Sequence, residues 1–201
     1  MPQLSLAFFQ RPDVLTIARE LLGKHLCTRI GGELTTGRIV ETEAYRHEGD
    51  PSITLHLQRK RTQAQGLYQP GGHAYFYTVY RVHTLLNITT YDAEHPDAVL
   101  IRAIEPLEGL DVMLRRRGLP KLARNLTAGP GVLSQALGVT PALTGELVTG
   151  PHVWLEDHNE HIAAENISAS SRVGLEYAGD EAVALPWRFR LQDSKWTSPA
   201  K

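Results

Sequence analysis

Apolar residues recur along this chain with two spacings, the three-to-four-residue period of a helix and the alternation of a strand. The helical period is clear at residues 13–22, where an apolar stripe follows Asp13 and precedes Gly23. Asp is a good N-cap and Gly commonly follows the last helical residue, so this segment is predicted to form a helix. Similar signals predict a helix after Pro106 that runs through Leu110, Met113 and Leu114 and ends in three arginines and Gly118. They predict another that opens at residues 127–130, with Pro130 near its first turn, and continues to Leu137.

Runs rich in β-branched, aromatic and aliphatic residues, separated by turn residues, predict the strands. They span residues 26–30, 38–45, 74–79, 82–90, 98–104, 148–155, 167–175 and 187–191. In the last run, Trp187, Phe189 and Leu191 alternate with Arg188, Arg190 and Gln192, as in a strand with one buried face. Strands with interspersed helices and hairpins indicate an α+β fold. We predict one domain, residues 1–201, with a largely antiparallel curved β-sheet, a protruding β-hairpin and surrounding helices.

The segment 46–72 breaks this pattern. It is polar, contains several Gly and Gln residues, and shows neither period. We predict a long loop, and a loop of this length inside a compact domain usually has a function or is mobile.

Two carboxylates lie on the predicted strand 38–45. Because side chains alternate along a strand, Glu41, Glu43 and Tyr45 share one face. For Glu41 we expect a solvated strand edge. Arg102 stands in the middle of an otherwise apolar strand, and burying an unpaired guanidinium costs several kcal/mol. Arg102 therefore needs a carboxylate, an anion or ordered water, and Glu41 and Glu43 are its candidate partners.

Composition narrows the function classes. The chain has 201 residues, of which 42% are hydrophobic and 21% charged, as in globular proteins. The single Cys27 excludes an internal disulfide framework and a Cys-based metal cluster within one chain. The first ten residues lack the features of a signal peptide, and no apolar run approaches the ~20 residues of a membrane span. We expect a reduced, cytoplasmic protein without membrane contact.

The charge is unevenly distributed although the net charge is only −1. Residues 53–91 contain no Asp or Glu but do contain Arg59, Lys60, Arg61 and Arg81, whereas residues 146–181 contain eight acids opposed only by Arg172. Such a chain can offer a positive face to phosphate groups while staying soluble. The alternative, that these charges mix in three dimensions, stays open at this point.

Tyrosines accompany this acid-free segment. Runs 74–79 and 82–90 are predicted to form a hairpin with Tyr80 near its tip, either exposed for a purpose or folded back onto its own strands. Aromatic side chains beside basic residues suit a stacked, unpaired base held by its flanking phosphates. A carboxylate in such a place can activate water to attack a sugar carbon as the base departs.

Several motifs resemble those of the alkyladenine (3-methyladenine, or methylpurine) DNA glycosylase family. They occur in the family's order along nearly the whole chain, at residues 21–24, 37–45, 72–77, 100–109, 135–137, 171–174 and 187–189. The resemblance implies an enzyme that flips a damaged purine, alkylated or also deaminated, out of duplex DNA and hydrolyses its N-glycosidic bond. It further implies an abasic product, no lyase chemistry, no cofactor and no metal.

The resemblance also implies roles for individual residues. Glu43 would be the general base that activates the attacking water, and Arg102 would hold that glutamate and its water. The base-binding residues would be Tyr45 and Tyr77, which sandwich the flipped base, a loop histidine, and Asn87 at the pocket floor. The family spacing places the histidine at His56 when counted from Thr62, but places Thr54 there when counted from Glu43; we choose His56.

The resemblance also implies contacts with DNA. Tyr80 would intercalate into the gap left in the duplex, and Arg59, Lys60, Arg61 and Arg81 are candidate phosphate contacts. This chain departs from the family pattern at 61–64, at Arg81, which replaces a glycine, and at Val132, which replaces a lysine. These departures bear on phosphate contacts and substrate range. The expected partner is double-stranded DNA with damaged purines, bound by a monomer that would associate with the nucleoid of a bacterial-type cell.

Two other classes compete with the glycosylase. One is a module that binds damaged or structured nucleic acid without catalysis. The other is a metal hydrolase, which is weakly supported because His56, His73 and His83 lack helical ligand spacing.

Overall fold

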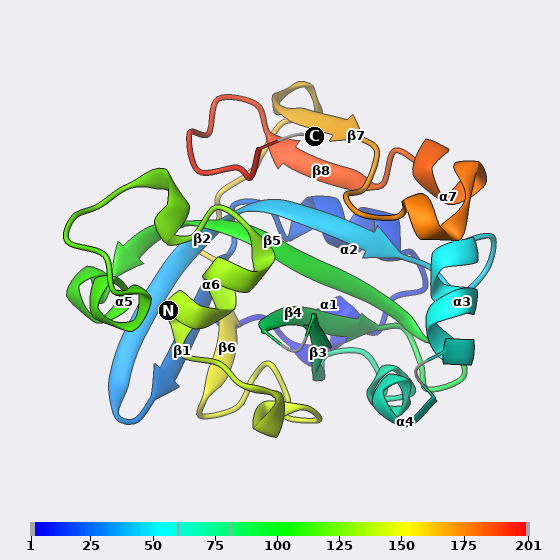
Figure 1. Ribbon diagram of the computed structural model, residues 1–201, viewed down its shortest axis with the longest axis horizontal. Coiled ribbons are helices and arrows are strands. Elements are labelled where there is room, and N and C mark those ends of the chain that lie inside the picture. The colour runs from blue at the N-terminus through cyan, green and yellow to red at the C-terminus, as the bar shows by residue number, and fades with distance from the viewer. Residues whose placement is uncertain (1–2, 60, 81, 200–201) are drawn as a thin grey trace.

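A curled antiparallel β-sheet forms the frame of the molecule (Figure 1). The computed structural model describes residues 3–59, 61–80 and 82–199, except for the side chain of Arg61. The strands are β1 His25–Ile30, β2 Glu33–Tyr45, β3 Ala74–Val79, β4 His83–Thr90, β5 Asp97–Glu108, β6 Val153–Glu156, β7 Ile167–Ser170 and β8 Arg188–Leu191. Their order is β3-β4-β5-β2-β1-β6, and β8 pairs with both β2 and β7. The predicted α+β fold with a curved antiparallel sheet is confirmed.

The long strand β2 is the centre of the sheet. It pairs with β5 along one edge, and along the other edge first with β1 and then with β8. The β2–β5 register is irregular beside Glu41, which lies opposite Ala103, whereas the next residue, Thr42, lies opposite Ile101. Arg102 falls in this bulge. Bulges redirect side chains, and here both glutamates of β2 come within reach of one guanidinium.

Helices surround the sheet. They are α1 Leu6–Phe9, α2 Val14–Glu20, α3 Pro51–Arg59, α4 Arg61–Ala64, α5 Leu110–Arg117, α6 Pro130–Leu137 and α7 Asp180–Ala184. The predicted cap of α2 is present, since the Asp13 carboxylate accepts from the backbone N–H groups of Leu15 and Thr16. The predicted stops of α5 and α6 are also confirmed, because Gly118 and Gly138 adopt the left-handed conformation with φ of 62° and 73°.

The prediction of a loop at 46–72 is wrong. This segment contains α3, α4 and a 3₁₀ helix at Gln65–Leu67. Its helical period is hidden because only a few apolar residues, among them Ile53 and Leu67, pack against Tyr75 and Ala98 in a second, small hydrophobic cluster. Buried Asp50, which directly precedes α3, adds the polar contacts described below.

Two predicted strands are shorter than expected. The run 148–155 is a tight turn followed by β6, with the Gly150 N–H donating to the Leu147 carbonyl. The run 167–175 leaves the sheet after Ser170, and Gly174 has a φ of 74°. The segment 171–177 thereby turns away from the sheet toward the chain segment after β2.

The hairpin of β3 and β4 is formed as predicted. Tyr80 ends it with a φ of 52° and 87% of its surface exposed, so the alternative in which Tyr80 folds back onto its strands is wrong. The main core lies between the sheet and helices α2, α5 and α6. Among the described residues no helix has the length and apolar character that crossing a membrane requires.

Candidate active site

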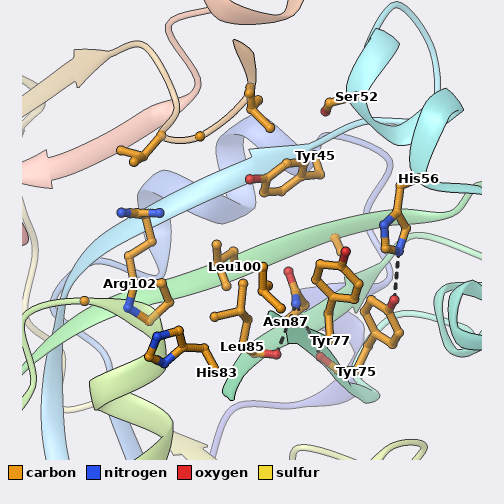
Figure 2. Close-up of a pocket in the computed structure, with 18 of the residues that line it drawn as sticks. Tyr45, Ser52, His56, Tyr75, Tyr77, His83, Leu85, Asn87, Leu100 and Arg102 are labelled. Carbon is orange, nitrogen blue, oxygen red and sulfur yellow. Dashed lines mark hydrogen bonds between the residues drawn. The ribbon is translucent and has the colours of Figure 1, made fainter. Parts of the chain in front are cut away.

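A cavity of about 590 Å³ opens beside the hairpin, a volume within the common range for small-molecule pockets. Its walls come from β2, α3, the β3–β4 hairpin, β5, the start of α6 and the segment after β7. Figure 2 shows the labelled side chains that surround it: Tyr45, Ser52, His56, Tyr75, Tyr77, His83, Leu85, Asn87, Leu100 and Arg102. Aromatic and aliphatic side chains dominate the described lining, which includes no Asp or Glu.

Glu43 lies directly behind this lining. Its side chain is fully buried, and the residues that contact it, Arg102, Tyr45 and Val173, all line the cavity. Glu43 Oε1 lies 3.2 Å from Arg102 Nη1 and accepts from the Val173 backbone N–H at 2.9 Å. Glu43 Oε2 accepts from the Tyr45 hydroxyl at 2.8 Å. The structure thus brings Glu43 and Arg102 together, as expected from the buried-charge argument.

Electrostatics keep these groups in defined protonation states. Burial opposes the charge of Arg102, but Glu43 and Glu41 raise its pKa above the usual value. Burial, followed by the negative charge of Glu43, raises the pKa of Tyr45 well above its ordinary value. The Tyr45 hydroxyl therefore stays protonated at neutral pH and donates to the carboxylate.

The expectation of a solvated Glu41 is wrong. Glu41 is fully buried, and its Oε1 pairs with Arg102 Nε at 2.7 Å and with Arg188 Nε at 2.8 Å. Arg188, expected on the polar face of the last strand, is only 1% exposed. Pairing of β8 with β2 sets Arg188 beside Glu43 in the register, so that the polar face of β8 meets the acids of β2. Sequence reasoning missed this role of Arg188, because alternation shows which residues share a face and not what covers that face.

Arg172 supports Tyr45 from outside the cavity. Its guanidinium carbon lies 4.7 Å from the centre of the Tyr45 ring, and its nitrogens donate to Asp50 at 2.5 and 2.8 Å and to the Ala44 carbonyl. Both charged side chains are fully buried. Neither residue was expected to have a role, although Arg172 lies in the motif at 171–174 and is the one cation in the acidic segment 146–181.

The opposite wall carries the predicted base-binding residues. His56 Nε2 lies 2.9 Å from the Tyr75 hydroxyl, and the His56 ring meets the Tyr77 ring edge-on with 4.6 Å between centres. The Asn87 amide donates to the carbonyl of Tyr75, although at a long 3.4 Å. Thr54, the alternative to His56, is exposed and is not among the lining residues. In Figure 2, Tyr45 projects from β2 on one side of the cavity, and Tyr77 and Asn87 project from the hairpin on the other.

The acid-free segment, residues 53–91, contributes to the lining of the cavity. Tyr80 is part of the lining, and the exposed Arg59 side chain lies over the ring of Tyr177, 5.8 Å from its centre. Sequence reasoning gave no role to Tyr177, which is half exposed and also lines the cavity. Lys60, Arg81 and the side chain of Arg61 lie outside the described residues, and all four candidate phosphate contacts, Arg59 included, stay predictions.

One group within the described part of the chain, His25, Glu156 and His158, has the donor atoms and spacing that could hold a metal ion. None of the three lines the cavity. The two imidazole rings stack with 3.8 Å between centres, and His158 pairs with Glu156, so these contacts account for the cluster. Of the histidines considered for a metal hydrolase, His56 and His83 line the cavity and His73 does not.

Comparison with known proteins agrees with the motifs. A family model of methylpurine-DNA glycosylase matches residues 7–195. Three relatives, each named "Putative 3-methyladenine DNA glycosylase", are similar over almost their whole length. The protein of Chlamydia felis is 40% identical over 94% of this chain and 96% of its own. The protein of Desulfitobacterium hafniense is 37% identical over 98% of this chain and 99% of its own. The protein of Methanoculleus marisnigri is 43% identical over 97% of this chain and 98% of its own.

Proposed function

The chain belongs to the methylpurine-DNA glycosylase family, and on this premise we propose that it removes damaged purines from duplex DNA with a water activated by Glu43. The observation that carries the proposal is the Glu43–Arg102 pair behind an apolar, tyrosine-lined cavity. The substrates would be alkylated purines such as 3-methyladenine, together with deaminated purines. The products would be the free base and an abasic site in an intact strand.

The carboxylate suits the reaction in two ways. Loss of the base gives the sugar the character of an oxocarbenium ion, which a nearby negative charge stabilises. The same carboxylate can accept a proton from water as it attacks the sugar carbon. A carboxylate oxygen has two lone pairs, and Tyr45 occupies one on Oε2. The other is where we place the attacking water.

The aromatic walls suit the base. An alkylated purine carries positive charge, which favours contact with the face of a tyrosine ring. Tyr45 and Tyr77 would stack on either side of the flipped base, His56 would complete the stack, and Asn87 would contact its edge. Rotating a nucleotide out of the duplex costs a few kcal/mol, least at a damaged or mispaired base. Tyr80 would offset part of this cost by filling the vacated space.

The cavity needs no second chain, since residues between Tyr45 and Tyr177 of one chain line it. We therefore propose a single-domain monomer, with Arg59, Lys60, Arg61 and Arg81 near the DNA phosphates. Attraction to DNA would hold the protein at the nucleoid of a bacterial-type cell.

The decisive experiment uses Glu43→Gln. The amide has almost the same shape as the carboxylate but accepts no proton. We expect base release from a duplex carrying 3-methyladenine or hypoxanthine to fall by about 10² to 10⁴-fold, while the lesion duplex is still bound. The matched control is Glu48→Gln, which changes an exposed acid beyond the end of β2 and should excise normally.

The same assay separates the rival functions. Excision by the wild-type protein should continue in excess chelator, and the strand should break only after alkali treatment. Binding of lesion duplex without base release would instead identify a non-catalytic module. Excision by Glu43→Gln at the wild-type rate would remove Glu43 as the base.

A further inference from the structure

Residues 196–198, here called the C-terminal segment, lie beside Glu41 and Arg102, behind the candidate active site. Trp196 packs into the main core, and the Thr197 carbonyl accepts from Arg124 Nε at 2.9 Å. These contacts deliver Ser198, which is only 5% exposed, to the carboxylate of Glu41. The Ser198 backbone N–H donates to Glu41 Oε2, and its hydroxyl donates to Glu41 Oε1 at 2.7 Å.

The Ser198 hydroxyl also accepts a hydrogen bond from Arg102. The Arg102 guanidinium has three nitrogens, and each meets a different side chain: Nε meets Glu41 at 2.7 Å, Nη2 meets the Ser198 hydroxyl at 3.2 Å, and Nη1 meets Glu43 at 3.2 Å. Because the guanidinium is planar and rigid, fixing Nε and Nη2 also fixes the direction in which Nη1 points. Two of the three contacts that aim Arg102 at Glu43 are thus made by Glu41 and Ser198.

Glu41 and Ser198 also stabilise the buried charges of Arg102 and Arg188. Arg102 and Arg188 are both buried and both pair with Glu41 Oε1, so one carboxylate separates two like charges. The Ser198 hydroxyl accepts from Nη2 of both arginines while it donates to Glu41, which uses its full capacity of one donor and two acceptors. Burial would raise the pKa of Glu41, but Arg102, Ser198 and Arg188 together lower it, so Glu41 stays ionised at neutral pH.

We propose that Glu41 and Ser198 are positioning residues for the Arg102–Glu43 pair, and that the C-terminal segment is therefore a working part of the active site. The proposal rests on the proposed glycosylase function. Neither residue lines the cavity, so both act through Arg102 and not on the substrate. Loss of the Ser198 hydroxyl should slow excision and leave the binding of damaged DNA nearly unchanged.

The test compares Ser198→Ala with Thr28→Val. Thr28 is a fully buried residue of β1, and its hydroxyl lies 2.7 Å from that of Thr35 and donates to the Leu137 carbonyl, away from the cavity. Both variants lose a buried hydroxyl and should lose thermal stability, but only Ser198→Ala disturbs Arg102. Single-turnover excision measured with enzyme in excess should fall about tenfold in Ser198→Ala and not in Thr28→Val, because small displacements in a reacting geometry are costly.

Further readouts distinguish positioning from general destabilisation. In Ser198→Ala the Kd for lesion duplex should stay within about twofold of the wild-type value while the rate falls. Ser198→Thr, which retains the hydroxyl, should recover most of the rate. If Ser198→Ala does not fold, Ser198→Cys keeps the size but hydrogen-bonds poorly, and a reduced rate is expected there too.

An unchanged rate in Ser198→Ala or Ser198→Cys would overturn the positioning role while leaving the proposed function intact. A rate loss equal to that of Thr28→Val would overturn it as well. Absence of base release by the wild-type protein would overturn both.

Discussion

Replacing Asp50 with Ala should destabilise this protein more than most single substitutions. Asp50 precedes α3, and its Oδ1 accepts from the Ser52 backbone N–H at 3.0 Å and from the Ser52 hydroxyl at 2.7 Å. The same carboxylate holds the Arg172 guanidinium with two hydrogen bonds. Ala would therefore remove a helix cap and a buried ion pair together.

The expected cost has two parts. Loss of an N-cap costs about 1 kcal/mol, and removing one member of a buried ion pair costs about 3–5 kcal/mol because the remaining charge is left unpaired. The sum, about 4–6 kcal/mol, is a large share of the roughly 5–15 kcal/mol by which a domain of this kind is stable. Both side chains of the pair are fully buried, so solvent screens little of this effect.

The assay is equilibrium unfolding in urea, followed by circular dichroism, with three matched variants. Asp13→Ala removes the exposed cap of α2 without breaking a buried pair and should cost about 1 kcal/mol. Asp50→Asn keeps an oxygen for the cap and should cost less than Asp50→Ala. Combining Asp50→Asn with Arg172→Gln removes both charges and should recover much of the loss.

Two results would refute this reasoning. One is a cost of Asp50→Ala no larger than that of Asp13→Ala. The other is a double variant no more stable than Asp50→Asn alone, which would show that the unpaired charge of Arg172 is not the cause.

Two further changes test other parts of the structure. Tyr80→Ala should weaken binding to lesion duplex and barely change the Tm, since the side chain is 87% exposed; a large fall in Tm would contradict the wedge role. Asp97→Asn tests pH dependence: burial raises the pKa of Asp97 from 3.8 to about 6, although the hydrogen bond from the His47 N–H opposes the shift. The raised pKa therefore adds to the free energy of unfolding below the unfolded pKa, 3.8, and this contribution is lost as the pH rises through about 6. The free energy of unfolding of the wild type should fall over this pH window, and that of Asp97→Asn should not. Parallel curves for the two proteins would contradict the assignment.

Local signals were sufficient for much of the fold. The cap at Asp13, the stops at Gly118 and Gly138 and the hairpin around Tyr80 all follow from interactions within a few residues, and the structure contains each of them. Buried charge was equally informative. An arginine within an apolar strand must have a partner, and Arg102 does contact the two glutamates expected for it.

Contacts between distant segments were beyond such reasoning. Asp50, which directly precedes α3, pairs with Arg172, which is 122 residues away. The burial of Glu41 depends on Arg188 and Ser198, 147 and 157 residues away. Polar residues at these positions are typical of solvated surfaces, and only the partner that covers them makes burial favourable.

The amino-acid sequence by itself determined the local elements, the family motifs and the need for a charge partner at Arg102, because these depend on residue type and short-range spacing. Tertiary structure alone decided that Glu41 is buried as well as Glu43, which arginines balance its charge, and that Ser198 contacts it. The physical reason is that the free energy of a buried charge depends on the groups within a few ångströms of it in space, wherever they lie along the chain.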